Sequence, residues 1–189
     1  MLLRLFLALL AGTLGAASAA ERPLTIDLPH SRVDIVVRAS VDSFTGRLER
    51  FEPRVGIDEA GRVVSARFAF RFREVATGKP KRDEAMHGWQ KTDEYPEGGF
   101  VLTSLEHVAD SSGRCLARGQ LTFHGVTREI TFPASVIQDG SLYSIDGDAT
   151  VDIREFGLPA IVKFLVLKVD PQVHVRFHLQ GRDPVPETS

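Results

Sequence analysis

The chain has 189 residues, of which 43% are hydrophobic and 25% are charged, and its formal net charge at pH 7 is -2. This length suits one domain with a substantial core, and the weakly negative charge excludes the basic field that gathers nucleic acid. Cys115 is the single cysteine, which excludes disulfides within the chain and zinc sites built from several thiolates. Because it lies on the apolar face of its segment, we predict a buried and inert thiol.

Residues 1–20 have the features of a secretory signal peptide. Arg4 precedes an apolar stretch from Leu5 to Leu14, and small residues follow up to Ala20. The apolar stretch is too short to cross a bilayer as a helix, and small residues are typical of a cleavage site. We therefore predict that the chain is exported and that the mature protein begins near residue 21.

Beyond the signal peptide, apolar and polar residues alternate with a period of two. This alternation is typical of antiparallel strands with one buried face and one solvated face. We predict about eight strands, which can close into a barrel. The residues predicted to face inward are Val33, Ile35, Val37, Val64, Ala66, Phe68, Phe70, Phe72, Tyr143, Ile145, Ala149, Val151, Val173, Val175, Phe177 and Leu179.

Residues 81–96 depart from the strand pattern. Ala85, Met86 and Trp89 have helical spacing, acidic residues stand near the start, and Pro96 follows the end. We predict a short helix that lies over one opening of the curved sheet.

The segment LTFHGVTREITF, residues 121–132, has a histidine and a glycine between two alternating stretches. A loop with an even number of residues keeps Phe123 and Phe132 on the same face of a hairpin. In the two-residue form the corner is His124 and Gly125, and both need positive φ, which glycine accepts freely and histidine tolerates. We therefore interpret His124 as a hairpin corner and expect its replacement to reduce stability more than binding.

The polar residues give little support for catalysis or metal binding. His174 and His178 are four apart on a predicted strand, which separates them by about 13 Å at ~3.3 Å per residue. The carboxylates of the preceding strand fall on its outward face, at Asp146, Asp148 and Asp152. We predict no catalytic residue, no metal ligand and no cofactor, and an enzyme or metal site that uses His124 remains as an alternative.

Several segments follow one another in a distinctive order. They are HSRVDIVVRAS, SFTGRLERF, KRDEAM followed by DEYPEGGFVLTS, LTFHGVTREITF, and IDGDATVDIREFGL. In this order they resemble the YceI-like family of bacterial periplasmic proteins, over residues 24–180. The resemblance implies an eight-stranded, lipocalin-like antiparallel barrel with a short helix near its mouth.

The resemblance also implies a function. It suggests a periplasmic binder or carrier whose apolar cavity holds a polyisoprenoid chain, as in a quinone or a polyprenyl lipid, and it does not suggest an enzyme. The barrel domain would span residues 21–181, followed by a polar tail at 182–189. The predicted wall of the cavity consists of Phe68, Phe70, Phe72, Met86, Trp89, Phe100, Phe123, Phe132 and Phe177.

In this interpretation the isoprenoid lipid is a ligand rather than a cofactor. Transient contact with a membrane and formation of a homodimer are compatible with it. The alternative is a ligand-free, stress-related interaction module of the same fold. That module would have a barrel packed solid with side chains, and the phenylalanines would then form an ordinary core.

Overall fold

The computed structural model describes residues 21–40, 42–108, 112–160, 162–163 and 167–184, so the predicted signal peptide lies outside the described residues. The strands are β1 (Arg22–Pro23), β2 (Thr25–Ile26), β3 (Arg32–Ala39), β4 (Phe44–Leu48), β5 (Phe51–Ile57), β6 (Val63–Arg71), β7 (Val75–Ala76), β8 (Glu97–His107), β9 (Arg114–Phe123), β10 (Val126–Asp139), β11 (Leu142–Asp152), β12 (Val162–Lys163) and β13 (Leu167–Arg182). The helices are α1 (Pro80–Gln90) and the 3₁₀ turns η1 (Leu28–His30), η2 (Phe72–Glu74) and η3 (Ile153–Phe156).

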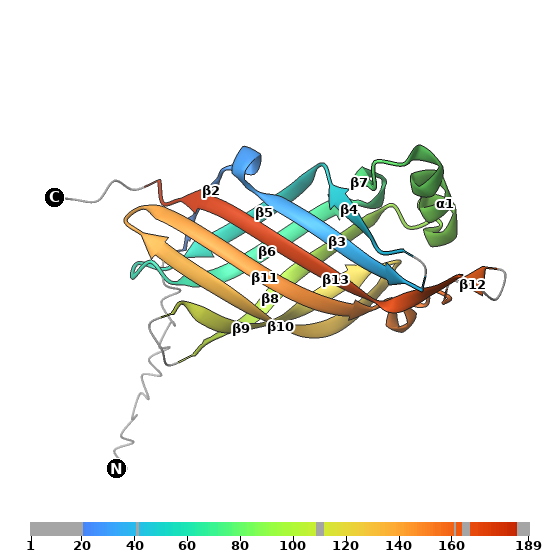
Figure 1. Cartoon of the computed structure of the whole chain (residues 1–189). Coiled ribbons are helices and arrows are strands. Elements are labelled where there is room, and N and C mark those ends of the chain that lie inside the picture. The colour runs from blue at the N-terminus through green and yellow to red at the C-terminus, as the bar shows by residue number, and fades with distance from the viewer. Residues whose placement is uncertain (1–20, 41, 109–111, 161, 164–166, 185–189) are drawn as a thin grey trace, which may run out of the picture.

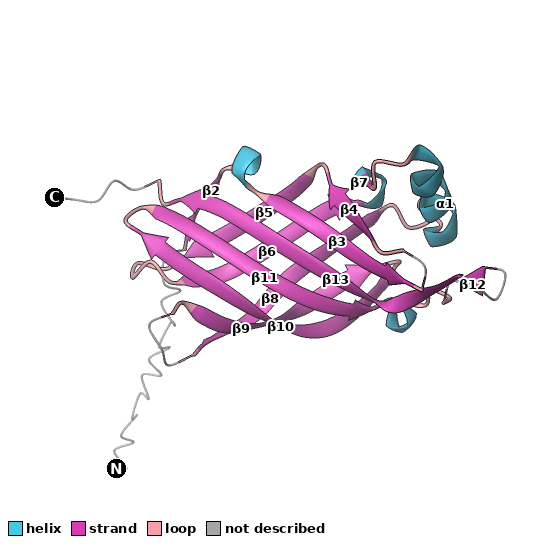
Figure 2. Ribbon diagram, viewed as in Figure 1, coloured by secondary structure: helices cyan, strands magenta, loops and turns pink. Residues whose placement is uncertain are grey.

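The strands form an antiparallel sheet that curls back on itself into a barrel (Figures 1 and 2). Neighbours follow the order β5, β6, β8, β9, β10, β11, β13, β3 and β4. Only Glu49 and Arg50 separate β4 from β5, so the path returns to its starting strand. The predicted antiparallel barrel is confirmed, but the strand count differs slightly: nine of the described strands lie along this path, and eight of them have seven or more residues.

The two ends of the chain join the same end of the barrel. β1 pairs with β5, β2 pairs with β13, and the Leu24 amide donates to the Val55 carbonyl at 2.8 Å. At the other terminus, Arg182 ends β13 and Asp183 forms an ion pair with Arg22 at 2.7 Å. Residues 185–189 of the predicted tail lie outside the described residues.

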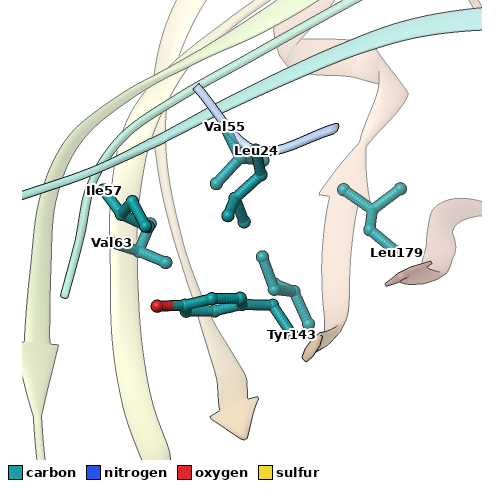
Figure 3. Close-up of a cluster of buried hydrophobic side chains, with 7 residues drawn as sticks. Leu24, Val55, Ile57, Val63, Tyr143 and Leu179 are labelled. Atoms are coloured by element: carbon teal, nitrogen blue, oxygen red, sulfur yellow. The ribbon is translucent and has the colours of Figure 1, made fainter. Parts of the chain in front are cut away.

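This end of the barrel, which we call the closed end, holds a cluster of buried hydrophobic side chains (Figure 3). Tyr143 is fully buried, and its hydroxyl crosses to the turn between β5 and β6, where it donates to the Gly61 carbonyl at 2.9 Å. In the same turn the Asp58 carboxylate accepts from the amides of Ala60 and Arg62, each at 2.9 Å. The cluster consists of Leu24, Val55, Ile57, Val63, Tyr143, Ile145 and Leu179.

The inward face of β6 starts one residue earlier than the alternation predicts. Val63 is 7% exposed, whereas Val64 is 51% exposed, so the prediction that Val64 faces inward is wrong. The cause is a β-bulge: Gly56 pairs with Ser65, but the next residue of β5 pairs with Val63. The extra residue on β6 changes the phase of the alternation, and the inward pattern resumes at Ala66.

The predicted hairpin corner is confirmed. His124 and Gly125 are the two turn residues between β9 and β10, with φ values of 49° and 71°, and Phe123 pairs with Val126 on either side of them. Both positive φ values match the two-residue turn that follows the twist of the flanking strands. The corner therefore places Phe123 and Phe132 on the inward face, as predicted.

The other end of the barrel, which we call the mouth, carries α1 (Figure 1). The helix starts at Pro80, and the Asp83 carboxylate in its first turn accepts from both the amide and the hydroxyl of Thr77, at 2.9 and 2.6 Å. Its C-cap residue is Lys91, whose φ of 54° is left-handed. The short helix predicted within 81–96 is thus confirmed; it begins at Pro80 and ends at Gln90, and Pro96 lies beyond its end.

Candidate ligand-binding cavity

A cavity of about 500 Å³ occupies the barrel between the closed end and α1. Val55, Val63, Ile145 and Leu179 belong both to its wall and to the core of the closed end. Tyr143 belongs to that core but not to the wall. The cavity therefore stops short of Tyr143, and its opposite limit lies at the helix over the mouth.

All nine residues predicted for the cavity lie in its wall. They come from six strands or turns and from α1, and the strand residues converge because alternate side chains of each strand point to the same face. Phe72 lies in η2 instead of the strand, yet it still faces inward and is 9% exposed. The nine are Phe68, Phe70, Phe72, Met86, Trp89, Phe100, Phe123, Phe132 and Phe177. Their role in binding stays a prediction.

The phenylalanine rings contact one another along the wall. Phe132 lies between Phe100 and Phe177, with ring centroids 5.5 and 6.0 Å away. Phe123 lies between Phe72 and Phe156, at 5.5 and 5.7 Å. These separations are typical of favourable aromatic pairs, so the rings stabilise one another without filling the middle of the barrel.

Glycines on neighbouring strands explain why several rings leave the middle of the barrel open. A Cβ atom added to Gly147 would collide with the ring tip of Phe177, its cross-strand partner. The same holds for Gly98 and its partner Phe70, and for Gly119 and the ring of Phe100. Each ring occupies the space that a side chain would take, and it therefore leans along the sheet. We call these contacts the glycine–phenylalanine pairs.

The helix α1 closes part of the mouth with three apolar side chains. Ala85, Met86 and Trp89 face the cavity, as their helical spacing predicts. The indole Nε1 of Trp89 donates to the Pro159 carbonyl at 3.3 Å, which joins α1 to the segment that follows η3. The helix is therefore tied to the far side of the mouth through one hydrogen bond.

Arg82 is a wall residue that the sequence reasoning missed. Its guanidinium carbon lies 4.3 Å from the centre of the Phe44 ring, and both residues belong to the wall. Within the described part of the chain, no carboxylate oxygen lies within 4 Å of its guanidinium nitrogens. The sequence does contain a signal for this position. Arg82 stands four residues before Met86, so both side chains lie on the same face of the helix.

His124 does not belong to the cavity wall. Its ring lies 4.1 Å from the Tyr95 ring, and Nδ1 donates to the Phe156 carbonyl at 3.0 Å. Its other nitrogen, Nε2, is buried and has no hydrogen-bond partner among the described residues. The imidazole thus joins the hairpin corner to η3.

The other polar groups pair on the outer surface. His178 lies 2.8 Å from Asp146 and Arg176 lies 3.1 Å from Asp148, each between the neighbouring strands β11 and β13. In the described residues, no group of three or more His, Cys, Asp or Glu side chains is placed to hold a metal ion. Cys115 is 3% exposed, and burial raises the pKa of its thiol, as expected for an inert residue.

None of the helices in the described ranges combines the length and the hydropathy that a transmembrane helix needs.

Comparison with known proteins places this barrel among relatives. The sequence pattern of the YceI-like domain matches residues 24–181. A protein of Pseudomonas putida designated UPF0312 protein is 27% identical over 172 residues, covering 84% of this chain and 88% of its own length.

Two solved structures share the fold. BcnA of Burkholderia cenocepacia superposes with a TM-score of 0.72 at 22% identity, covering 82% of this chain and 98% of its own. A polyisoprenoid binding domain from Saccharophagus degradans superposes with a TM-score of 0.65 at 19% identity, covering 88% and 99%.

Proposed function

The chain belongs to the YceI-like domain family, and we propose that it binds the apolar chain of an isoprenoid lipid, of the quinone or polyprenyl type, inside its barrel. The observation that carries this proposal is the cavity of about 500 Å³ with its almost wholly apolar wall. The polyisoprenoid binding domain from Saccharophagus degradans, which shares the fold, supports the same class of ligand.

The hydrophobic effect alone can supply the affinity. Burying each methylene group contributes about 0.8 kcal/mol, so several isoprene units can offset the cost of ordering a flexible chain. Phenylalanine suits this wall because its rings are large, rigid and free of polar groups that would need partners. A lipid chain held in this way is shielded from water along its length.

We further propose that the protein works as a carrier in the periplasm. The features of residues 1–20 support export, and a water-filled compartment between two membranes is where an apolar lipid needs a shielding protein. The lipid is a ligand in this proposal, since a carrier shields the chain from water and leaves it chemically unchanged.

A matched pair of substitutions on one strand tests the proposal. Ala66 faces the cavity from β6, and Ala69 faces outward from the same strand and is exposed. Ala66→Phe fills part of the cavity, whereas Ala69→Phe adds the same ring outside the barrel. The exported protein is purified in its native state, extracted with organic solvent and examined by mass spectrometry.

We expect co-purified isoprenoid lipid in the wild type and in Ala69→Phe, and much less of it in Ala66→Phe. A delipidated sample should also take up a fluorescent isoprenoid analogue in the same order. A wild-type protein that carries no lipid and takes up none would contradict the proposal.

A ligand-free interaction module of the same fold is the second candidate. It requires a barrel filled by its own side chains, and the closed end alone has that character. The open cavity favours the binding function over this alternative.

A further inference from the structure

Three charged residues border the otherwise apolar cavity: Arg67, Arg82 and Asp170. Arg67 lies on the outward face of β6 and is exposed, so its charge is solvated outside the barrel. Asp170 accepts a hydrogen bond from the Gln172 amide at 2.9 Å. Arg82 differs from both, because its cation lies over an aromatic ring of the wall and has no ionic partner among the described residues.

The surroundings of Arg82 leave its donors available at the mouth. The Phe44 ring, 4.3 Å from the guanidinium carbon, covers one face of the planar group but cannot accept along its edge. A guanidinium that is taken out of water normally finds carboxylate or phosphate oxygens, since removing a charge from water is costly without a partner. The free edge of Arg82 is thus suited to oxygen atoms that arrive with a ligand.

We propose that Arg82 binds an anionic head group, of the phosphate or diphosphate class, at the end of the isoprenoid chain. This inference rests on the proposed function, because it assumes that the chain occupies the cavity. Phosphate oxygens accept two parallel N–H bonds from a guanidinium and also compensate its charge. A neutral quinone carbonyl accepts a hydrogen bond but leaves that charge uncompensated.

The position of Arg82 also sets the orientation of the ligand. Met86 and Trp89 follow Arg82 along the same face of α1 and would contact the first isoprene units. The tail would point toward the closed end, where Tyr143 and its neighbours leave no space. The head group stays at the mouth, where water and the guanidinium can both reach it.

Two probes with the same chain separate the head group from the tail: geranylgeranyl phosphate and geranylgeraniol. Each is titrated into the delipidated full chain by displacement of a fluorescent isoprenoid analogue. We expect the wild type to bind the phosphate about tenfold more tightly than the alcohol, because hydrogen bonds between a guanidinium and an anionic oxygen are stronger than those to a neutral hydroxyl. Arg82→Gln should remove that preference, because it should weaken binding of the phosphate much more than binding of the alcohol.

Lys81→Gln is the matched control. Lys81 is the exposed neighbour of Arg82 on α1, lies outside the wall, and its substitution removes the same charge. We expect this variant to keep the preference for phosphate, and Arg82→Lys to keep part of it.

Four outcomes would overturn the head-group assignment. Equal affinity of the wild type for both probes overturns it while the proposed function stands. A loss of the same size for both probes in Arg82→Gln assigns the residue a structural role instead. An equal effect of Lys81→Gln indicates general electrostatic attraction. Failure of both probes to bind overturns the proposed function as well.

Discussion

The two ends of the barrel are built from the same strands but differ in how their interiors are packed. At the closed end, Leu24 and the turn that contains Gly61 cover the barrel, and Tyr143 fills the remaining space. Beyond this cluster, the rings of Phe70 and Phe177 lean along the sheet and the middle of the barrel stays open. One alternating pattern thus produces a packed core at one end and a cavity at the other. We therefore expect stability to depend mainly on the closed end and binding on the wall.

The largest effect should follow from truncating Tyr143. Tyr143→Ala removes a fully buried ring, so the free energy of unfolding should fall by about 3–5 kcal/mol in urea denaturation. Tyr143→Phe, the control, removes only the hydrogen bond to Gly61 and should cost about 1 kcal/mol. Because Tyr143 lies beyond the cavity, isoprenoid affinity of the folded fraction should not change. A strong loss of affinity in Tyr143→Phe would erase the distinction between the two ends.

A substitution in the cavity wall should reduce binding more than stability. Phe132→Ala removes a ring that contacts both Phe100 and Phe177, and it should weaken isoprenoid binding by about 1–2 kcal/mol, or roughly tenfold. We expect a smaller loss of stability than for Tyr143→Ala, because this ring already borders empty space. Titration with a fluorescent isoprenoid, beside urea denaturation, measures both. Unchanged affinity would show that the ligand does not reach the middle of the barrel.

The hairpin corner should affect stability alone. His124→Ala removes the bond to the Phe156 carbonyl and the contact with Tyr95, and it places alanine at a left-handed position, so we expect a cost of about 1–2 kcal/mol. His124→Asn, the control, tolerates that backbone better and isolates the lost side-chain contacts. Thermal and urea denaturation measure the cost. If His124→Ala instead abolished an activity in a stable protein, the corner would have a chemical role.

The smallest expected effect is a dependence of stability on acid pH. Backbone hydrogen bonds from Arg62 and Ala60 hold the pKa of Asp58 below its ordinary value. This carboxylate therefore stabilises the fold above its unfolded pKa of about 3.9, and the stabilisation is lost as the pH falls through the lower folded pKa. Asp58→Asn should be less stable than the wild type at neutral pH, and the two should converge in acid. Urea denaturation between neutral and acid pH tests this, and a constant difference would contradict it.

Much of the fold follows from local sequence. The alternation places Phe68, Phe100 and Phe132 inward, and helical spacing places Met86 and Trp89 toward the cavity. These predictions succeed because the period of a strand or a helix is a property of its own residues.

The sequence predictions fail, or miss a residue, where the outcome depends on a residue of another element. The bulge at Val64 depends on the register with β5, and the role of Arg82 depends on Phe44 from a distant strand. Alternation alone also does not distinguish a ring that fills a core from a ring that lines a cavity. That difference depends on which residue stands on the neighbouring strand.

The glycine–phenylalanine pairs make the bore of the cavity adjustable in small steps. The ring tip of Phe177 rests where a side chain at Gly147 would stand, so a single methyl group there pushes the ring toward the barrel axis. Such a change narrows the channel without introducing a polar group or altering the strand register. Related proteins can therefore differ in the width of the lipid chain that they accept. The residues that set this difference are glycines that do not contact the ligand.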